Sequence, residues 1–335
     1  MDVLSDVLRA VRLTGAVFFD NEAHSPWVAS SPNSAAITTV MPGAEHVISF
    51  HSLLAGECWA EIPDDPTPPV HLRAGDIVIF PMGDPNVLCS SPGMRGEINF
   101  SIYNRPTDRA LPVPYVLNQG AGGHETCHFV CGYFGCDARP FNPLLDALPR
   151  MFVAQVSPAS QNWLSNLIRV ATEESEHGSA GGETMLAKLA ELIFVEVVRK
   201  HIDGLPQDAR GWFSALRDRH IGLAMRLIHA RPAEPWTIEG LAREVGLSRS
   251  AFAERFTDYV HVAPMHYLAR WRMQLAARIL EKQGVSVSQA AAEVGYESDA
   301  AFNRSFKKYL GVSPGAWRRS CLSEVGNERL ARAKH

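Results

Sequence analysis

The sequence predicts two domains, a mainly-β N-terminal domain with flanking helices and an all-α C-terminal domain. The 335 residues exceed the usual length of one domain. Short apolar runs separated by Pro and Gly fill the first half, whereas a helical segment is repeated in the last third. Charge divides as well: residues 213–335 hold 19 Lys and Arg against 12 Asp and Glu (net +7), and residues 1–212 hold 13 against 24 (net −11). The basic part predicts a polyanion partner.

The N-terminal half predicts a helix followed by closely spaced strands. Residues 3–13 have the apolar period of a helix. β-branched and aromatic runs at 47–50, 58–62, 76–80 and 128–134 are typical of short strands, and Pro and Gly punctuate the segments between them. This pattern predicts an antiparallel sandwich or barrel.

Two helices are predicted after the strands, over residues 160–174 and 184–201. The second carries a wide apolar face centred on Leu189, Ile193 and Val197. Either this face packs on the sheet as core, or it forms a subunit interface. The second interpretation predicts a homodimer.

No segment of the sequence is apolar for long enough to span a bilayer, and its start lacks the basic region of a signal peptide. We therefore expect a cytoplasmic protein with no membrane partner. The six cysteines are spread through a sizeable chain, which indicates reduced thiols and not a disulfide scaffold.

The repeat in the last third carries the clearest functional signal. Residues 237–246 recur 49 positions later, with apolar residues at i, i+3, i+4 and i+7 in both copies. Thr237 and Ser286 stand where N-caps belong, and Gly246 and Gly295 stand where a left-handed residue closes a helix. A second helix follows each glycine. Helix, glycine turn and second helix, twice over, predict two helix-turn-helix units.

From residue 221 to residue 319 the sequence resembles the AraC/XylS family of transcription activators. The most family-like stretches are 290–308 and 311–314. The resemblance implies a sequence-specific regulator that activates transcription, with double-stranded DNA and RNA polymerase as its partners. It also implies that the helix over 264–282 spaces the two recognition helices one DNA turn apart, roughly 34–36 Å.

The outward faces of the two second helices predict the DNA contacts. Arg304 suits a guanine edge and Asn303 an adenine edge, whereas Lys307 and Lys308 suit phosphates. Glu254 is acidic where a basic or amide residue is expected, so we expect the second unit to supply the larger share of affinity. The predicted set is Arg249, Ser250, Ala253, Glu254, Asp299, Ala300, Asn303, Arg304, Lys307 and Lys308.

The strand-rich half resembles the cupin sensor domains of the same family. Residues 75–86 follow the second cupin motif, G-x5-P-x-G-x2-H, but end in Asn86, a poor ligand for zinc or iron. His46 and His51 are five residues apart, which places them on opposite faces of a strand. We therefore expect no metalloenzyme and no other enzyme. We expect a cupin-like barrel with room for one small ligand, with His51 and Asn86 at its mouth.

A cluster of histidines and cysteines over residues 124–136 leaves three interpretations open: oxidant-sensing thiols, a zinc site, or small buried hydrophobes. Within one strand Cys127 and Cys131 would lie about 13 Å apart, so each needs a partner elsewhere, such as Cys58 or Cys89. The cluster resembles cupin sensors of a subgroup that answers reactive chlorine or other electrophiles. No cofactor is predicted, with zinc as the alternative. The candidate sensor residues are His51, Asn86, Cys89, His124, Cys127, His128 and Cys131.

The predicted boundaries follow from these assignments. Residues 1–202 form the cupin-like sensor and dimerisation domain, and 203–212 form a linker. Residues 213–320 form the AraC-type DNA-binding domain, and 321–335 form a tail.

Overall fold

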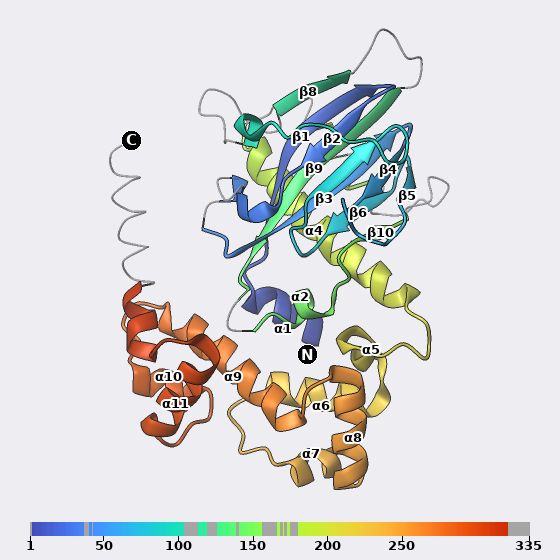
Figure 1. The fold of residues 1–335 in the computed structure, drawn as a ribbon. Helices are drawn as coiled ribbons and strands as arrows, with labels where there is room; N and C mark the ends of the chain where they lie inside the picture. The colour runs from blue at the N-terminus through green and yellow to red at the C-terminus, as the bar shows by residue number, and fades with distance from the viewer. Residues whose placement is uncertain are drawn as a thin grey trace. The chain divides into compact units, whose positions relative to one another are not determined.

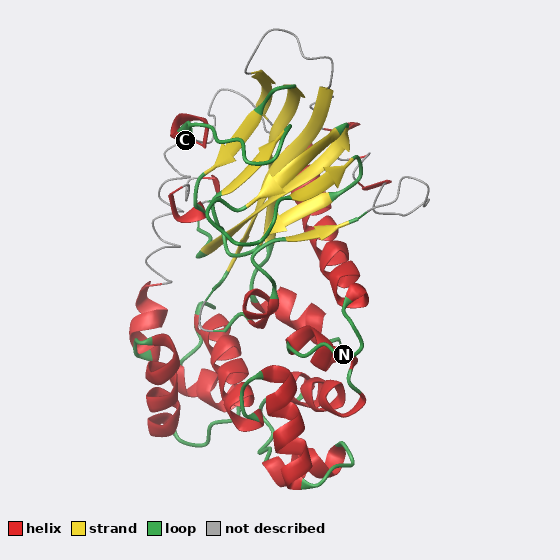
Figure 2. Ribbon diagram, turned by 45° about the vertical axis from the view of Figure 1, so that its right-hand side comes forward, coloured by secondary structure: helices red, strands yellow, loops and turns green. Residues whose placement is uncertain are grey.

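A computed structural model describes residues 2–36, 40–41, 43–103, 113–118, 126–138, 141–155, 166–167, 170, 173–174 and 180–320. They form two compact units, a β unit within 12–137 and 148–205, and a helical unit within 2–11, 138–147 and 206–320. Figures 1 and 2 show the strands gathered in the first unit. This confirms the predicted fold class, whereas the domain boundaries stay predictions. None of the described helices is both long and apolar enough to cross a membrane.

The described strands of the β unit form two sheets. The six-stranded sheet has the order β10-β6-β3-β9-β1-β8, and the four-stranded sheet has the order β2-β7-β4-β5. All pairings are antiparallel except that of β1 with β8. The strands are β1 (Thr14–His24), β2 (Val28–Ser31), β3 (His46–Ala55), β4 (Glu57–Glu61), β5 (Val70–Arg73), β6 (Ile77–Phe80), β7 (Asn86–Cys89), β8 (Val113–Asn118), β9 (Thr126–Cys136) and β10 (Phe152–Ala154).

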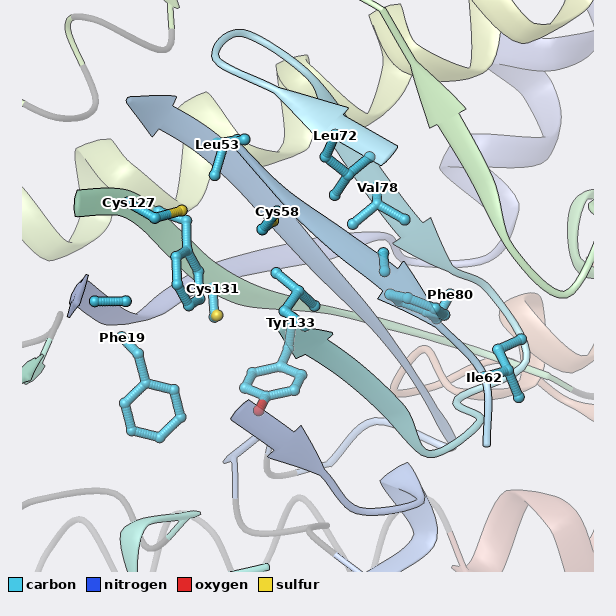
Figure 3. Packing of buried hydrophobic residues seen from close by; sticks show 14 of the residues in the cluster. Phe19, Leu53, Cys58, Ile62, Leu72, Val78, Phe80, Cys127, Cys131 and Tyr133 are labelled. Carbon is cyan, nitrogen blue, oxygen red and sulfur yellow. The ribbon is translucent and has the colours of Figure 1, made fainter. Parts of the chain in front are cut away.

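The core of the β unit is lined by alternate residues of the long strands. Along β9 the residues Cys127, Phe129, Cys131 and Tyr133 all belong to one buried cluster, as the two-residue period of a strand requires. Figure 3 shows three of these side chains within that cluster. β3 pairs with β9 so that His51 lies directly opposite Cys131. The register therefore brings together two residues that are far apart in the sequence.

Helix α4 (Gly182–Gly204) covers one face of the six-stranded sheet, as Figure 1 shows. Its close approach to β1 occurs at Gly15, where an added Cβ would meet backbone atoms of Ala187 and Glu191. The face predicted as either core or interface is buried within the unit, with Ile193 5% exposed and Val197 fully buried. The interpretation of this face as a subunit interface is therefore wrong, because the sheet already covers it.

The helical unit contains α1 and α2 together with all described helices after α4. The predicted caps are confirmed: Thr237 and Ser286 accept hydrogen bonds from backbone N–H groups, and Gly246 and Gly295 have φ of 70° and 81°. Most of the predicted helix over 160–174 lies outside the described residues. The helices are α1 (Val3–Ala10), α2 (Pro143–Ala147), α5 (Trp212–Arg217), α6 (Arg219–Ala230), α7 (Ile238–Glu244), α8 (Arg249–Val260), α9 (Pro264–Leu280), α10 (Val287–Glu293) and α11 (Asp299–Leu310).

Candidate functional site

The second helix of each helix-turn-helix unit, α8 and α11, exposes the residues predicted to contact DNA. Both helices turn two phenylalanines inward, Phe252 and Phe256 in α8 and Phe302 and Phe306 in α11, all fully buried. Of the ten predicted contact residues, nine are exposed and Ala253 is half-buried. The inward and outward faces are therefore as expected, whereas contact with DNA stays a prediction.

The two helices differ in how their cations are used. On α8, Arg249 Nε lies 2.8 Å from an oxygen of Glu239, and Arg255 pairs with Asp218. Asp258 on the same helix pairs with Arg210 at 2.6 Å. Both arginines of α8 therefore already have a carboxylate partner within the protein.

On α11 the cations have no such partners among the described residues. Arg304, Lys307 and Lys308 form no ion pair in the described part of the chain, although Lys308 lies over the ring of Tyr309. Asn303 donates from Nδ2 to the Asp299 carbonyl at 2.7 Å, and its carbonyl oxygen stays available. The surface of α11 therefore offers uncompensated positive charge to a polyanion.

In the β unit, a chain of hydrogen bonds joins three of the predicted sensor residues. His51 Nδ1 lies 2.7 Å from Cys131 Sγ, and His51 Nε2 lies 2.9 Å from Asn86 Oδ1. His51 and Asn86 are 4% and 1% exposed, so they lie inside the unit and not at a mouth. Asn21 donates from Nδ2 to Cys131 Sγ at 3.4 Å.

The partners of Asn86 determine which nitrogen of His51 carries the proton. Asn86 Nδ2 lies 3.2 Å from the carbonyl oxygen of Asp84, which can only accept, so Oδ1 is the atom that faces His51. That oxygen accepts from the Nε2–H group of His51. The Nδ1 lone pair is therefore directed at Cys131, where it can accept the thiol proton.

Burial keeps this pair neutral at rest. Burial lowers the pKa of His51 to about 4, against the opposing effect of the Asn86 hydrogen bond. Burial also raises the pKa of the Cys131 thiol well above its ordinary value, although the Asn21 amide opposes the shift. At rest the pair is therefore a neutral imidazole beside a neutral thiol.

The buried His51 predicts that acid weakens the β unit. The folded pKa of about 4 lies below the ordinary value of 6.5, so below about pH 6.5 the unfolded chain binds a proton that the folded chain does not bind. Stability from this group is complete above pH 6.5 and falls towards pH 4, by up to about 1.4 kcal/mol per pH unit. Urea unfolding at several pH values should show a shallower acid loss in His51→Gln than in wild type. Equal slopes would contradict the assignment.

The remaining sensor candidates are not part of the hydrogen bonds that join Cys131, His51 and Asn86. The thiols of Cys58 and Cys127 are hydrogen-bonded, and this bond together with burial raises the pKa of Cys58. Cys89 Sγ lies 3.8 Å from the Trp59 carbonyl oxygen, and burial raises its pKa to about 11. The expectation that Cys127 needs a cysteine from elsewhere is thus met by Cys58.

Of the two histidines nearest these cysteines in sequence, the structure describes only His128. His128 Nε2 lies 2.7 Å from Asp20 Oδ1, on the neighbouring strand. His124 lies outside the described residues. Among the described residues, His51 is the histidine that contacts Cys131. The two are far apart in the sequence, and the pairing of β3 with β9 brings them together.

The residues at the cupin motif position do not fit a metal ion. Asn86 accepts from the Nε2–H group of His51, and Cys131 faces the Nδ1 lone pair, so neither nitrogen is free for coordination. In the described ranges no group of three or more His, Cys, Asp or Glu side chains converges on one point.

Beside Cys131 lies a cavity of about 90 Å³. His51 was expected at a ligand site, whereas the other polar residues of the lining were not predicted, because segments far apart in the sequence supply them. Three tyrosines, Tyr103, Tyr115 and Tyr133, share it with Asn21 and His51. A second cavity of about 220 Å³ is lined by Cys58 and Cys127.

Comparison with known proteins finds a family match for each of two parts of the chain. Residues 2–203 match the family model described as Cupin, and residues 241–320 match the model described as Helix-turn-helix domain. The chain is 30% identical over 277 residues to the HTH-type transcriptional regulator AlkR of Acinetobacter baylyi, covering 82% of this chain and 89% of AlkR.

Two further relatives match over nearly the whole length. A protein described as an AraC-like transcription regulator in Streptomyces lividans is 27% identical over 319 residues, covering 95% of this chain and 98% of that protein. The RCS-specific HTH-type transcriptional activator RclR of Escherichia coli is 26% identical over 322 residues, covering 95% and 97%.

Proposed function

Because the chain belongs to the AraC/XylS family of DNA-binding transcriptional regulators with an N-terminal cupin domain, we propose that it activates transcription from specific promoters under control of that domain. Its partners are then double-stranded DNA and RNA polymerase, in the cytoplasm where both are found. RclR, which carries the word activator in its name, is similar over almost the whole chain. No enzymatic activity and no cofactor are needed for this function.

The observation that carries the DNA-binding proposal is the contrast between α8 and α11. Cations that already have carboxylate partners must give up those pairs to meet phosphate, whereas Arg304, Lys307 and Lys308 need not. We place the larger share of affinity and of base readout on α11, with Arg304 on a guanine and Asn303 on an adenine.

Substitution of Arg304 tests this assignment. Arg304→Ala should cost about 1–3 kcal/mol on the preferred site and relax discrimination at one base position. Lys308→Ala, at a phosphate, should weaken all sequences alike and flatten the salt dependence. The measurement is binding to the preferred duplex and to random duplexes over a series of salt concentrations. Equal loss on both kinds of DNA for Arg304→Ala would remove it from base readout.

For the signal, we propose a small polar ligand bound in the cavity beside Cys131. The cavity is small, and its lining offers hydroxyl, amide and imidazole groups that can form hydrogen bonds, together with the carboxylate of Glu97. The lowered pKa of His51 keeps its ring neutral, so the site offers hydrogen bonds and not a fixed positive charge. Burial also raises the pKa of Cys131, which favours a ligand over a standing reactive thiolate.

The contact between His51 and Cys131 favours oxidation of that thiol as the second candidate signal. An oxidant that reaches the cavity would meet a thiol with a base 2.7 Å away. Cys127 is the other candidate, through its contact with Cys58.

Hypochlorite and diamide separate the two signals. If oxidation is the signal, either reagent should change transcription by the wild type and not by Cys131→Ser or Cys127→Ser. If a ligand is the signal, all three proteins should respond alike, and mass spectrometry should find both thiols free. The matched control is Cys136→Ser, a buried cysteine on the same strand, β9, that is not among the candidate sensor residues.

We also propose that the protein acts as a homodimer, through the outer face of α4. Met185 and Leu192, seven residues apart on that helix, are 44% and 48% exposed. Sedimentation of wild type and Leu192→Asp at micromolar concentration tests this, because only the wild type should sediment as a dimer.

A further inference from the structure

A buried amide in the helix that connects the two helix-turn-helix units ties it to distant parts of the chain. Gln274 of α9 is 1% exposed. Its Oε1 accepts from the Phe141 backbone N–H at 3.0 Å, and its Nε2 donates to the Ala10 carbonyl at 2.9 Å. One side chain thus binds the backbones of two segments that precede it in the chain by 133 and 264 residues.

Both segments pack as parts of the helical unit. Helix α1 contacts α6 and α9 and buries Val3, Leu4 and Val7. Phe141 is 3% exposed and meets the Tyr267 ring of α9 edge-on, with centroids 5.4 Å apart.

A second tether holds the later segment to the same helix. Arg270 of α9 lies over the Phe141 ring at 4.1 Å and pairs with Asp146 of α2 at 3.1 Å. Residues 2–11 and 141–147 therefore complete the unit that carries the DNA-binding helices.

The same segments run directly into the central strands of the β unit. Helix α1 leads into β1, and β9 leads into residues 138–147. β1 and β9 are paired where they approach these segments, with Thr14 opposite Gly135. Just beyond that pair, the Arg12 guanidinium donates to both carboxylate oxygens of Asp137, at 2.6 to 3.0 Å.

We propose that Gln274 is the positioning residue through which the β unit acts on the DNA-binding helices. Two of the passages of the chain from one unit to the other lie at the ends of β1 and β9, and Gln274 is bonded to the backbone of both segments that continue from them. Because α9 also joins the two helix-turn-helix units, its position sets the spacing of α8 and α11. This inference rests on the proposed role of the β unit as a sensor, but its test requires neither ligand nor oxidant.

A buried glutamine is not needed merely to fill space on α9. An apolar residue would pack there without the cost of burying an amide, which is repaid only when every polar atom is bonded. Here both ends of the amide are bonded, and both partners are backbone atoms that any sequence would present. What the amide adds over an apolar residue is a fixed alignment of three chain segments.

A double-mutant cycle on the full chain tests the proposal. The DNA is the duplex that the wild type selects from a random-sequence pool, and the measurement is the dissociation constant. Arg12→Met loosens the paired ends of β1 and β9 and should weaken binding about fivefold or more. In the Gln274→Met background the same change should weaken binding less than about twofold, because the connection is already cut. The matched control is Gln283→Met, the same replacement at an exposed position, where Arg12→Met should keep its full effect.

Equal fold-changes in both backgrounds, or no effect of Arg12→Met, would overturn the proposal. Hydrogen exchange supplies a measurement that does not depend on whether Gln274→Met folds. With Gln274 intact, Arg12→Met should speed exchange of the Phe141 amide and of the α9 amides around Gln274. If exchange there is unchanged, the β unit does not act through this residue. A failed cycle leaves the ligand and oxidant experiments unaffected, so the two proposals fail separately.

Discussion

Replacement of Ile193 by aspartate is expected to unfold the β unit, whereas the same replacement at the neighbouring Leu192 should leave it folded. Ile193 is 5% exposed beneath the sheet, and Leu192 is 48% exposed. An aspartate at 193 would bury a charge without a partner and lose the packing of the isoleucine, at a cost of about 4 kcal/mol or more. At 192 the expected change in unfolding free energy is within about 0.5 kcal/mol.

Thermal and urea unfolding of the two variants check this expectation. The pair is matched, because the introduced residue is the same and the positions are adjacent in one helix. If Ile193→Asp were folded and monomeric, the face would belong to a subunit interface after all. The same preparations report on the outer face of α4, since Leu192→Asp should be folded whether or not it still forms a dimer.

The wide apolar face of α4 illustrates the limit of prediction from periodicity. A helical period shows that one side of a helix is buried, but it does not show whether the sheet or a second subunit covers that side. The deciding observation is the close approach of α4 at Gly15, which depends on where β1 lies.

The sequence predicted more details of the helix-turn-helix units than of the sensor site. N-caps, C-cap glycines and inward aromatics are local signals, and Thr237 and Ser286 cap their helices as expected. The contact of His51 with Cys131 depends instead on the pairing of β3 with β9, residues separated by 80 positions. The cupin motif indicated Asn86 and the cysteine cluster indicated Cys131, but no sequence pattern linked them.

The sequence also could not predict that α1 and residues 141–147 pack within the helical unit. The amphipathic period of α1 predicted a helix and a buried face, and both are present. Its partners are α6 and α9, more than 200 residues further along the chain, and no local sequence pattern indicates the bond from Gln274 to Ala10.

Replacement of Gly295 by alanine is expected to damage the helical unit more than the same replacement at Gly246, its counterpart in the first repeat. Both glycines have positive φ, 81° and 70°, so alanine strains the backbone at either position by about 1 kcal/mol. At Gly246 an added Cβ would meet nothing within 4 Å. At Gly295 it would lie 2.4 Å from the carbonyl oxygen of Ala233, in the loop before α7.

That loop cannot simply move away, because α9 holds it on both sides of Ala233. Arg272 donates to the carbonyl oxygens of Pro232 and Glu234, each at 2.7 Å. Relief of the overlap would therefore break these bonds or shift the second helix-turn-helix unit. We expect Gly295→Ala to cost about 2–4 kcal/mol of unfolding free energy, against about 1 kcal/mol for Gly246→Ala.

The contact at Gly295 also joins the turn of the second unit to the loop that precedes the first. A displacement there should change the spacing of α8 and α11, so Gly295→Ala should lower affinity for DNA even at temperatures where the protein is folded. Gly246→Ala, with open space around it, should bind nearly as the wild type does. Urea unfolding and DNA titration of both variants provide the comparison, and equal losses would show that the left-handed conformation alone, and not the contact with Ala233, requires glycine at 295.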